Sequence, residues 1–163
     1  MARVLIVGCG CRGRGLAAAL LAEGHAVRGT TRRSEGLSRI EATGARAAVA
    51  DPDRLATILP QLEGVSALCW LMGSAVGEPE AVAALHGPRL ETLLERLVDT
   101  PVRGVVYEAA GRVHDDLLDR GAALVNAASE TWRIPVESVD EDPAHHEAWL
   151  AAMTKAVDRL LAG

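Results

Sequence analysis

The chain has 163 residues, of which 49% are hydrophobic, so it can form the core of one α/β domain but has too few residues for a second, substrate-binding domain. Its net charge of −5 argues against nucleic acid or an anionic membrane surface as a partner. No apolar run is long enough to span a bilayer or to serve as a signal peptide, and the three cysteines suggest reduced thiols, so we expect a cytoplasmic protein.

The N-terminal segment predicts a strand, a glycine turn, a helix and a second strand. Residues 4–7 have the length and branching of a buried parallel strand. Apolar residues then recur at helical spacing from Leu16 to Leu21, and Gly24 is a candidate C-cap. Val27 begins the second strand. This order, packed into about thirty residues, is typical of a βαβ nucleotide-binding unit.

The turn between the first strand and the helix carries Gly8, Gly10 and Gly13 in the spacing G-x-G-x-x-G. The first glycine permits a sharp turn, the second lets a pyrophosphate approach the backbone, and the third lets the helix lie close to the strand. The free amides at the start of the helix favour an anion. The motif therefore predicts dinucleotide binding, and a purely structural glycine turn is the alternative.

The end of the second strand indicates which dinucleotide is bound. An NAD site usually has an acidic residue there, which binds the ribose hydroxyls. This chain has Thr30, Thr31, Arg32 and Arg33 instead, and its next carboxylate is Glu35. Arginine forms bidentate, charge-assisted hydrogen bonds to phosphate, so the pair favours NADP over NAD through the 2′-phosphate. A solvated arginine pair in a loop is the alternative.

Strands and helices continue to alternate through the rest of the chain. Further strands are predicted at residues 45–50, 65–72, 102–107 and 134–139, and further helices at 37–42, 54–62, 81–97, 113–132 and 144–161. Pro88 either kinks its helix or marks its start, and Gly121 could break the next one. We therefore predict one Rossmann domain over residues 1–163, a doubly wound parallel sheet of order 3-2-1-4-5-6 in three α/β/α layers.

In such a sheet the ligand lies across the carboxyl ends of the strands. The loops that follow strands one to five are expected to face it. They carry residues 8–13, 30–33, Asp51, 72–74 and 108–111.

The glycine turn, the Gly24-His25 pair before the second strand and the Thr-Thr-Arg-Arg segment together resemble an atypical short-chain dehydrogenase/reductase of the NAD(P)-dependent epimerase/dehydratase type. The resemblance covers about the first 115 residues. It implies that Asp51 contacts adenine and that the loop after strand four passes the ribose. With the glycine turn, the predicted cofactor-binding residues are Gly8, Cys9, Gly10, Cys11, Arg12, Gly13, Thr31, Arg32, Arg33, Asp51, Leu71, Met72 and Gly73.

The residues expected for catalysis in that family are missing. Ala109 and Ala110 stand where the family has serines, and the family's Tyr-x-x-x-Lys pair is absent. Tyr107, the only tyrosine, lies on a predicted strand and is followed four residues later by Gly111. The only lysine, Lys155, follows the last predicted strand.

Three weaker catalytic candidates remain, and two of them have a structural alternative. Glu108, on the exit loop of strand five, could act as an acid or a base if it is desolvated, or could be a solvated loop carboxylate. His86 lies near the expected nicotinamide side. His114 could transfer protons, or could belong to a solvated first helical turn. Cys9 and Cys11 lack further ligands, so we expect no metal site, and their redox activity stays open.

Two functions fit these observations. The first is a minimal NADP-dependent oxidoreductase or epimerase-like enzyme of unknown substrate, because hydride chemistry belongs to the cofactor. The second is a non-catalytic NADP(H)-binding redox sensor or regulatory subunit, which the missing catalytic residues favour. A homodimer is compatible with either function.

Overall fold

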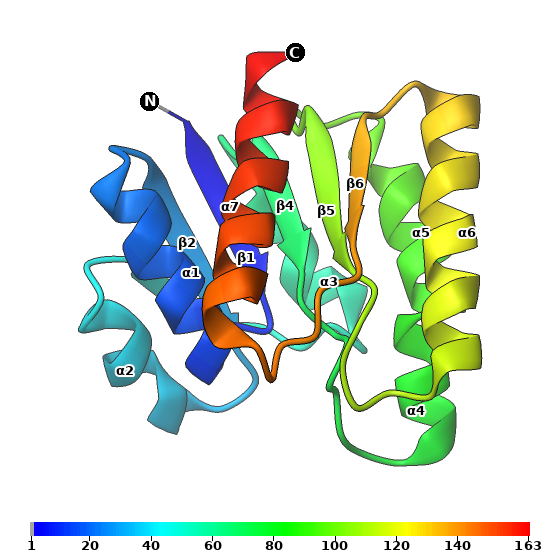
Figure 1. The fold of residues 1–163 in the computed structure, drawn as a ribbon, viewed down its shortest axis with the longest axis horizontal. Coiled ribbons are helices and arrows are strands. Elements are labelled where there is room, and N and C mark those ends of the chain that lie inside the picture. The colour runs from blue at the N-terminus through cyan, green and yellow to red at the C-terminus, as the bar shows by residue number, and fades with distance from the viewer. Residues whose placement is uncertain (1) are drawn as a thin grey trace.

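The computed structural model describes residues 2–163 and contains one six-stranded parallel sheet (Figure 1). The strands are β1 (Arg3–Val7), β2 (Ala26–Thr31), β3 (Arg46–Val49), β4 (Ala67–Trp70), β5 (Gly104–Glu108) and β6 (Val136–Val139). Their order is β3-β2-β1-β4-β5-β6, which confirms the predicted topology. The order reverses between β1 and β4, so a crevice forms there at the carboxyl ends of the strands.

The helices follow the predicted alternation, with different boundaries. They are α1 (Cys11–Ala22), α2 (Leu37–Glu41), α3 (Leu55–Ile58), α4 (Pro79–Leu85), α5 (Pro88–Leu97), α6 (Asp115–Trp132) and α7 (His146–Ala162). Pro88 starts α5 and does not kink a longer helix, because proline fits the first helical position, where no backbone donor is needed.

Helix α6 runs unbroken through Gly121, where the sequence suggested a break. The reason lies in packing. A Cβ atom at Gly121 would collide with the hydroxyl and ring carbons of Tyr107 on β5. Glycine therefore allows α6 to lie close to the sheet over the tyrosine ring.

Helices cover both faces of the sheet, as they must, because successive apolar side chains of β1 point to opposite faces. Leu5 and Val7 face a core that includes α5 and part of α6, whereas Val4 and Ile6 face a core built with α1 and α7. Figure 1 shows α1 and α7 side by side on this second face, and they are in contact. The predicted three-layer arrangement is confirmed.

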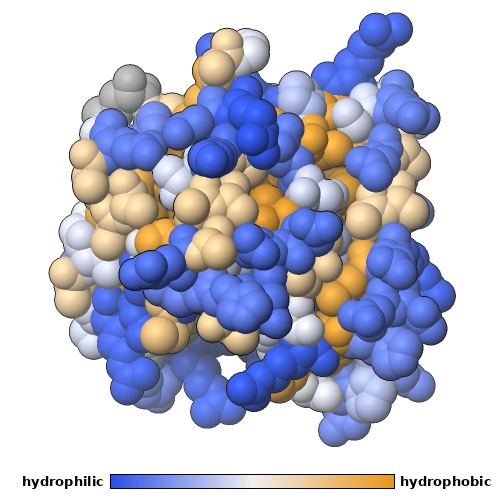
Figure 2. Space-filling model, viewed as in Figure 1, coloured by the Kyte–Doolittle hydropathy of each residue, from blue (hydrophilic) through white to orange (hydrophobic). Residues whose placement is uncertain are grey.

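Hydrophilic side chains predominate on the face that carries α1 and α7, with hydrophobic atoms in smaller patches between them (Figure 2). Among residues 2–163, no helix combines the length and the apolar character needed to cross a bilayer.

An ion pair between a partly exposed arginine and a buried carboxylate joins the two halves of the sheet at its carboxyl edge. Arg12, in the first turn of α1, donates from Nε to Glu108 Oε2 at 2.7 Å and from Nη2 to Oε1 at 2.6 Å. Glu108 ends β5 and is completely buried. It also accepts hydrogen bonds from the Gly73 amide at 2.8 Å and from Trp149 Nε1 at 3.0 Å. One carboxylate therefore ties α1, the loop after β4 and α7 to the end of β5.

The loops that follow β4 and β5 are bonded to each other. The Val113 amide donates to Gly73 O at 2.9 Å, and the Arg112 amide donates to Ser74 Oγ at 3.1 Å. A Cβ atom at Gly73 would collide with the carbonyl oxygen of Ala110. The two loops thus lie in direct backbone contact and leave no space between them at Gly73.

A second buried polar pair lies behind the loop after β4. His86 Nε2 lies 2.8 Å from Met72 O, and Nδ1 lies 2.6 Å from the Tyr107 hydroxyl, so a neutral ring protonated at Nε2 satisfies both contacts. Burial lowers the pKa of His86 and raises that of Tyr107, because it disfavours the charged form of each. Both side chains are completely buried.

We predict that Arg12→Ala lowers the free energy of unfolding by about 3 kcal/mol, because it leaves the buried Glu108 carboxylate without its cationic partner. Urea unfolding measures this loss. The matched control is Arg89→Ala, which breaks a pair with Asp53 whose side chains are 43% and 37% exposed, and should cost less than about 1 kcal/mol. Equal losses in the two variants would contradict a structural role for the Arg12–Glu108 pair.

We also predict a pH dependence that comes from His86. The unfolded chain binds a proton at this residue near pH 6.5, whereas the lowered pKa keeps the folded residue neutral. The stability due to this difference is complete above pH 6.5 and is lost as the pH falls toward the folded pKa. The stability advantage of wild type over His86→Gln should therefore shrink between pH 7 and 5, by up to about 1.4 kcal/mol per pH unit. Parallel profiles in urea titrations would contradict this, and His145→Gln at an exposed position is the control.

Candidate functional site

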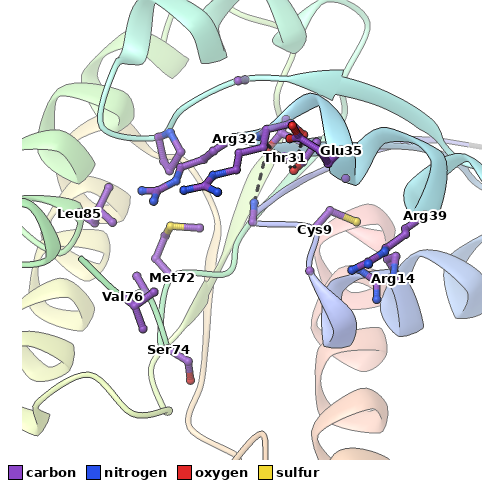
Figure 3. Close-up of a pocket in the computed structure, with 18 residues that line it drawn as sticks. Cys9, Arg14, Thr31, Arg32, Glu35, Arg39, Met72, Ser74, Val76 and Leu85 are labelled. Carbon is purple, nitrogen blue, oxygen red and sulfur yellow. Dashed lines mark hydrogen bonds between the residues drawn. The ribbon is translucent and has the colours of Figure 1, made fainter.

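A cavity of about 480 Å³ opens at the carboxyl ends of β1 to β4 (Figure 3). Its lining comes from the glycine turn, the segment that follows β2, and the loops after β3 and β4. The lining residues are Gly8, Cys9, Gly10, Arg14, Thr30, Thr31, Arg32, Arg33, Glu35, Gly36, Arg39, Ala50, Pro52, Met72, Ser74, Ala75, Val76 and Leu85.

The glycine turn forms the floor of this cavity. Gly8 has φ +87°, a conformation that favours glycine, and a Cβ atom there would collide with Met72 and the Leu71 carbonyl. Gly10 faces open space, because a Cβ atom there would meet nothing within 4 Å. Gly13, in α1, packs against the end of β1, and a Cβ atom there would lie 3.0 Å from Gly8 O. A ligand can therefore approach the backbone at Gly10 without displacing any side chain.

The start of α1 has free donors for an anion. Gly10 is its N-cap and provides no side-chain cap, and the first turn has no acidic residue. The first backbone amides of a helix have no intrahelical partner, and they carry the positive end of the helix dipole. With Gly10 open above them, these amides form a site suited to phosphate.

Positive charge surrounds this floor. Arg14, Arg32, Arg33 and Arg39 line the cavity, and Glu35 is its only lining carboxylate. Within residues 2–163, none of the four guanidinium groups forms an ion pair. The cavity therefore presents unpaired cations, and the residues that line it attract a ligand with several negative charges.

The segment after β2 is held in a defined turn. Thr31 Oγ1 donates to Arg33 O at 3.2 Å and accepts from the Arg33 amide at 3.4 Å. Thr30 is almost fully buried, and its Oγ1 accepts a 3.4 Å hydrogen bond from the Gly8 amide. These bonds fix the arginine pair beside the glycine turn.

Apolar side chains line the side of the cavity that faces Arg14 and Arg39, and the Arg32 side chain extends toward them. Figure 3 shows Met72, Val76 and Leu85 on one side and Arg14 and Arg39 on the other, with Cys9 between them. Burial raises the pKa of the Cys9 thiol to about 11, so it stays protonated at neutral pH. Cys9 packs against Gly29, where a Cβ atom would lie only 2.7 Å from its sulfur. This thiol thus fills space below the cavity.

Part of the predicted cofactor-binding set lines the cavity: Gly8, Cys9, Gly10, Thr31, Arg32, Arg33 and Met72. Three of the others have side chains that are engaged elsewhere. Arg12 pairs with Glu108, Asp51 accepts the Asp53 amide within its own turn at 2.9 Å, and Leu71 is buried in the core. Cys11, Gly13 and Gly73 are also outside the lining.

Sequence reasoning missed two of the four cationic residues, Arg14 and Arg39. Arg14 stands one helical turn after Gly10, and Arg39 stands in the helix that follows the arginine pair. The sequence does carry a signal for both. Arg14 belongs to the helix that follows the glycine turn, and Arg39 belongs to the helix that follows Arg32 and Arg33, so both helices begin beside the predicted phosphate site.

The loop after β5, which we expected to face the ligand, does not line this cavity, because all the lining residues lie between Gly8 and Leu85. Glu108 does not face solvent and is engaged in the ion pair with Arg12. His86 is buried behind Met72, and His114 is exposed at the start of α6, where its Nδ1 accepts the Asp116 amide at 3.2 Å. The structure therefore brings none of the three catalytic candidates into the cavity.

No protein-family model matches the sequence, and no curated protein matches it. Solved structures do match the fold. A putative NAD-dependent epimerase/dehydratase from Bacillus halodurans has 17% identity and a TM-score of 0.70, with 88% of this chain and 71% of that one covered.

Two further matches were determined with a bound dinucleotide. One is a short-chain dehydrogenase/reductase superfamily protein from Agrobacterium tumefaciens with bound NAD, at 21% identity and a TM-score of 0.69, covering 85% of this chain and 48% of that one. The other is Citrobacter sp. triphenylmethane reductase complexed with NADP(H), at 18% identity and a TM-score of 0.62, covering 85% and 49%.

The chain spans about half the length of several structures that it matches. At these identities the likeness concerns the fold. The chain therefore has the Rossmann-type fold found in short-chain dehydrogenase/reductase and epimerase/dehydratase structures, which confirms the resemblance noted in its sequence.

Proposed function

We propose that this protein binds NADP(H) in the cavity at the carboxyl ends of β1 to β4. The observation that carries the proposal is the pair of unpaired arginines, Arg32 and Arg33, fixed directly after β2 beside an open glycine turn. In dinucleotide-binding folds this position meets the ribose of the adenosine half. Two guanidinium groups there suit a 2′-phosphate.

The glycine turn supplies the second anchor. Its open Gly10 and the amides at the head of α1 suit the pyrophosphate, which in this fold rests on the helix N-terminus. Cys11, Arg12 and Gly13 would take part through their backbone amides. The structures from Agrobacterium and Citrobacter that share the fold bind NAD and NADP(H), respectively, which supports a nicotinamide dinucleotide as the ligand.

The apolar side of the cavity suits a flat base. Ala50, Pro52, Met72, Val76 and Leu85 line it and provide hydrophobic surface for adenine. Asp51 lies between two of these lining residues and would approach the base from the loop after β3. The cavity thus combines an apolar slot, a helix N-terminus and a cationic rim, which match the base, the pyrophosphate and the 2′-phosphate.

We infer that the protein binds the dinucleotide and that this chain supplies no proton-transfer group. Tyr107 and His86 are buried and bonded to each other, and Glu108 is paired with Arg12. A second candidate function, an NADP-dependent reductase, is supported by the likeness to triphenylmethane reductase and needs a proton from water or the ribose. Turnover of NADPH with a carbonyl or quinone would favour this second function.

We predict that Arg32→Ala combined with Arg33→Ala weakens NADPH binding by at least about 30-fold, because two charge-assisted contacts to the 2′-phosphate are lost. NADH affinity should change by less than about threefold. Isothermal titration calorimetry measures both.

The matched control is Arg46→Ala combined with Arg103→Ala, which changes the net charge equally. Both control residues are exposed and lie at the amino-terminal edge of the sheet, away from the cavity. This control should leave both affinities within about threefold of wild type. Equal loss of NADPH and NADH binding in the Arg32/Arg33 variant would contradict the phosphate assignment.

A further inference from the structure

We propose that the cavity takes only the 2′-phosphoadenosine half of NADP(H), and that the nicotinamide half stays in solvent. This inference rests on the proposed function and defines the recognised ligand more narrowly. Its consequence is that the protein binds the oxidised and reduced forms equally. It would respond to the total amount of NADP(H) and not to its redox ratio.

The position of the cavity is the first step in the argument. All its lining residues come from the segment between Gly8 and Leu85, around β1 to β4. The arginine pair that follows β2 places the adenosine half on the side of β2 and β3. A dinucleotide crosses the crevice at the switch point, so its other half must continue from the glycine turn toward the ends of β4 and β5.

Protein groups already fill that second side. The Arg12 side chain leaves the head of α1 and reaches the end of β5, where both of its hydrogen bonds to Glu108 are 2.7 Å or shorter. The guanidinium carbon lies 6.0 Å from the centre of the Trp149 ring, and Trp149 donates to the same carboxylate. The path from the glycine turn toward β5 is therefore occupied by the Arg12–Glu108 pair, which two hydrogen bonds and the Trp149 indole hold in place.

The loops close the same side from the outer edge. Gly73 and Val113 are joined by a backbone hydrogen bond of 2.9 Å, and Gly73 packs against Ala110 without room for a methyl group. The Gly73 amide, which faces this side, is already taken by Glu108 Oε1. Neither loop offers a free slot for a nicotinamide ring between β4 and β5.

Admitting the nicotinamide would require Arg12 to leave Glu108. That carboxylate is completely buried, and a buried charge without its partner is strongly unfavourable. The adenosine side needs no such rearrangement, because its arginines form no ion pairs within residues 2–163. The protein thus recognises one half of the ligand without rearrangement and excludes the other.

Calorimetry on the wild-type chain tests the inference with four ligands: NADPH, NADP+, 2′-phospho-ADP-ribose and NADH. The third ligand keeps the 2′-phosphate and the pyrophosphate and lacks only the nicotinamide ring. We expect the first three to bind within about threefold of one another and NADH to bind at least about 30-fold more weakly. In saturation-transfer NMR with NADPH, saturation should pass from the protein to the adenine protons and not to the C4 protons of nicotinamide. NADPH binding more than about threefold tighter than 2′-phospho-ADP-ribose, or saturation at nicotinamide C4, would overturn the inference.

These outcomes separate the inference from the function on which it rests. If NADPH and 2′-phospho-ADP-ribose both fail to bind, the proposed function itself is wrong. If NADPH binds with its nicotinamide ring in contact, the function stands and only the inference fails.

A variant designed to gain contact with the nicotinamide ring tests whether the ion pair is what excludes this ring. Arg12→Ala combined with Glu108→Ala removes both charges and opens the side toward β5. In the folded variant, we expect saturation to appear at nicotinamide C4 and NADPH to bind more tightly than 2′-phospho-ADP-ribose. A folded variant with an unchanged pattern would overturn the role of the ion pair. If the variant does not fold, the wild-type comparison still decides the inference.

Discussion

The ion pair between Arg12 and Glu108 is the constraint on which the carboxyl edge of this sheet depends. It links residues 96 positions apart, and its carboxylate also holds the Gly73 amide and the Trp149 indole. A buried carboxylate needs this many donors, because burial of an unpaired charge is strongly unfavourable. Four segments of the chain therefore meet at one completely buried group.

This arrangement divides the ligand-binding edge of the fold into two unlike halves. On the side of β2 and β3, arginines without ion pairs among the described residues surround an open glycine turn. On the side of β4 and β5, the buried Glu108 carboxylate is already paired with Arg12 and the loops are bonded to each other. One half can attract a phosphorylated ligand, whereas the other has already satisfied its own polar groups. The proposed binding function follows from this asymmetry.

Local patterns in the sequence were enough to predict the sheet and the cationic half of the site. The apolar runs gave the strands and their order, and the glycine spacing located the floor of the cavity beside Arg32 and Arg33. Contacts between distant residues could not be predicted. Nothing near Glu108 in the sequence indicates Arg12 or Trp149 as its partners, so the sequence predicts neither its burial nor its ion pair. The role of Gly121 could not be predicted for the same reason. It lies within an unbroken α6 because the helix packs against the ring of Tyr107, which leaves no room for a side chain there.

The most direct measurement is a crystal structure of the chain grown with NADPH. The account predicts density for the adenosine 2′-phosphate between Arg32 and Arg33, with the Arg12–Glu108 pair intact and the nicotinamide ring without contacts to the protein. Density for nicotinamide over the ends of β4 and β5, with Arg12 displaced from Glu108, would contradict it.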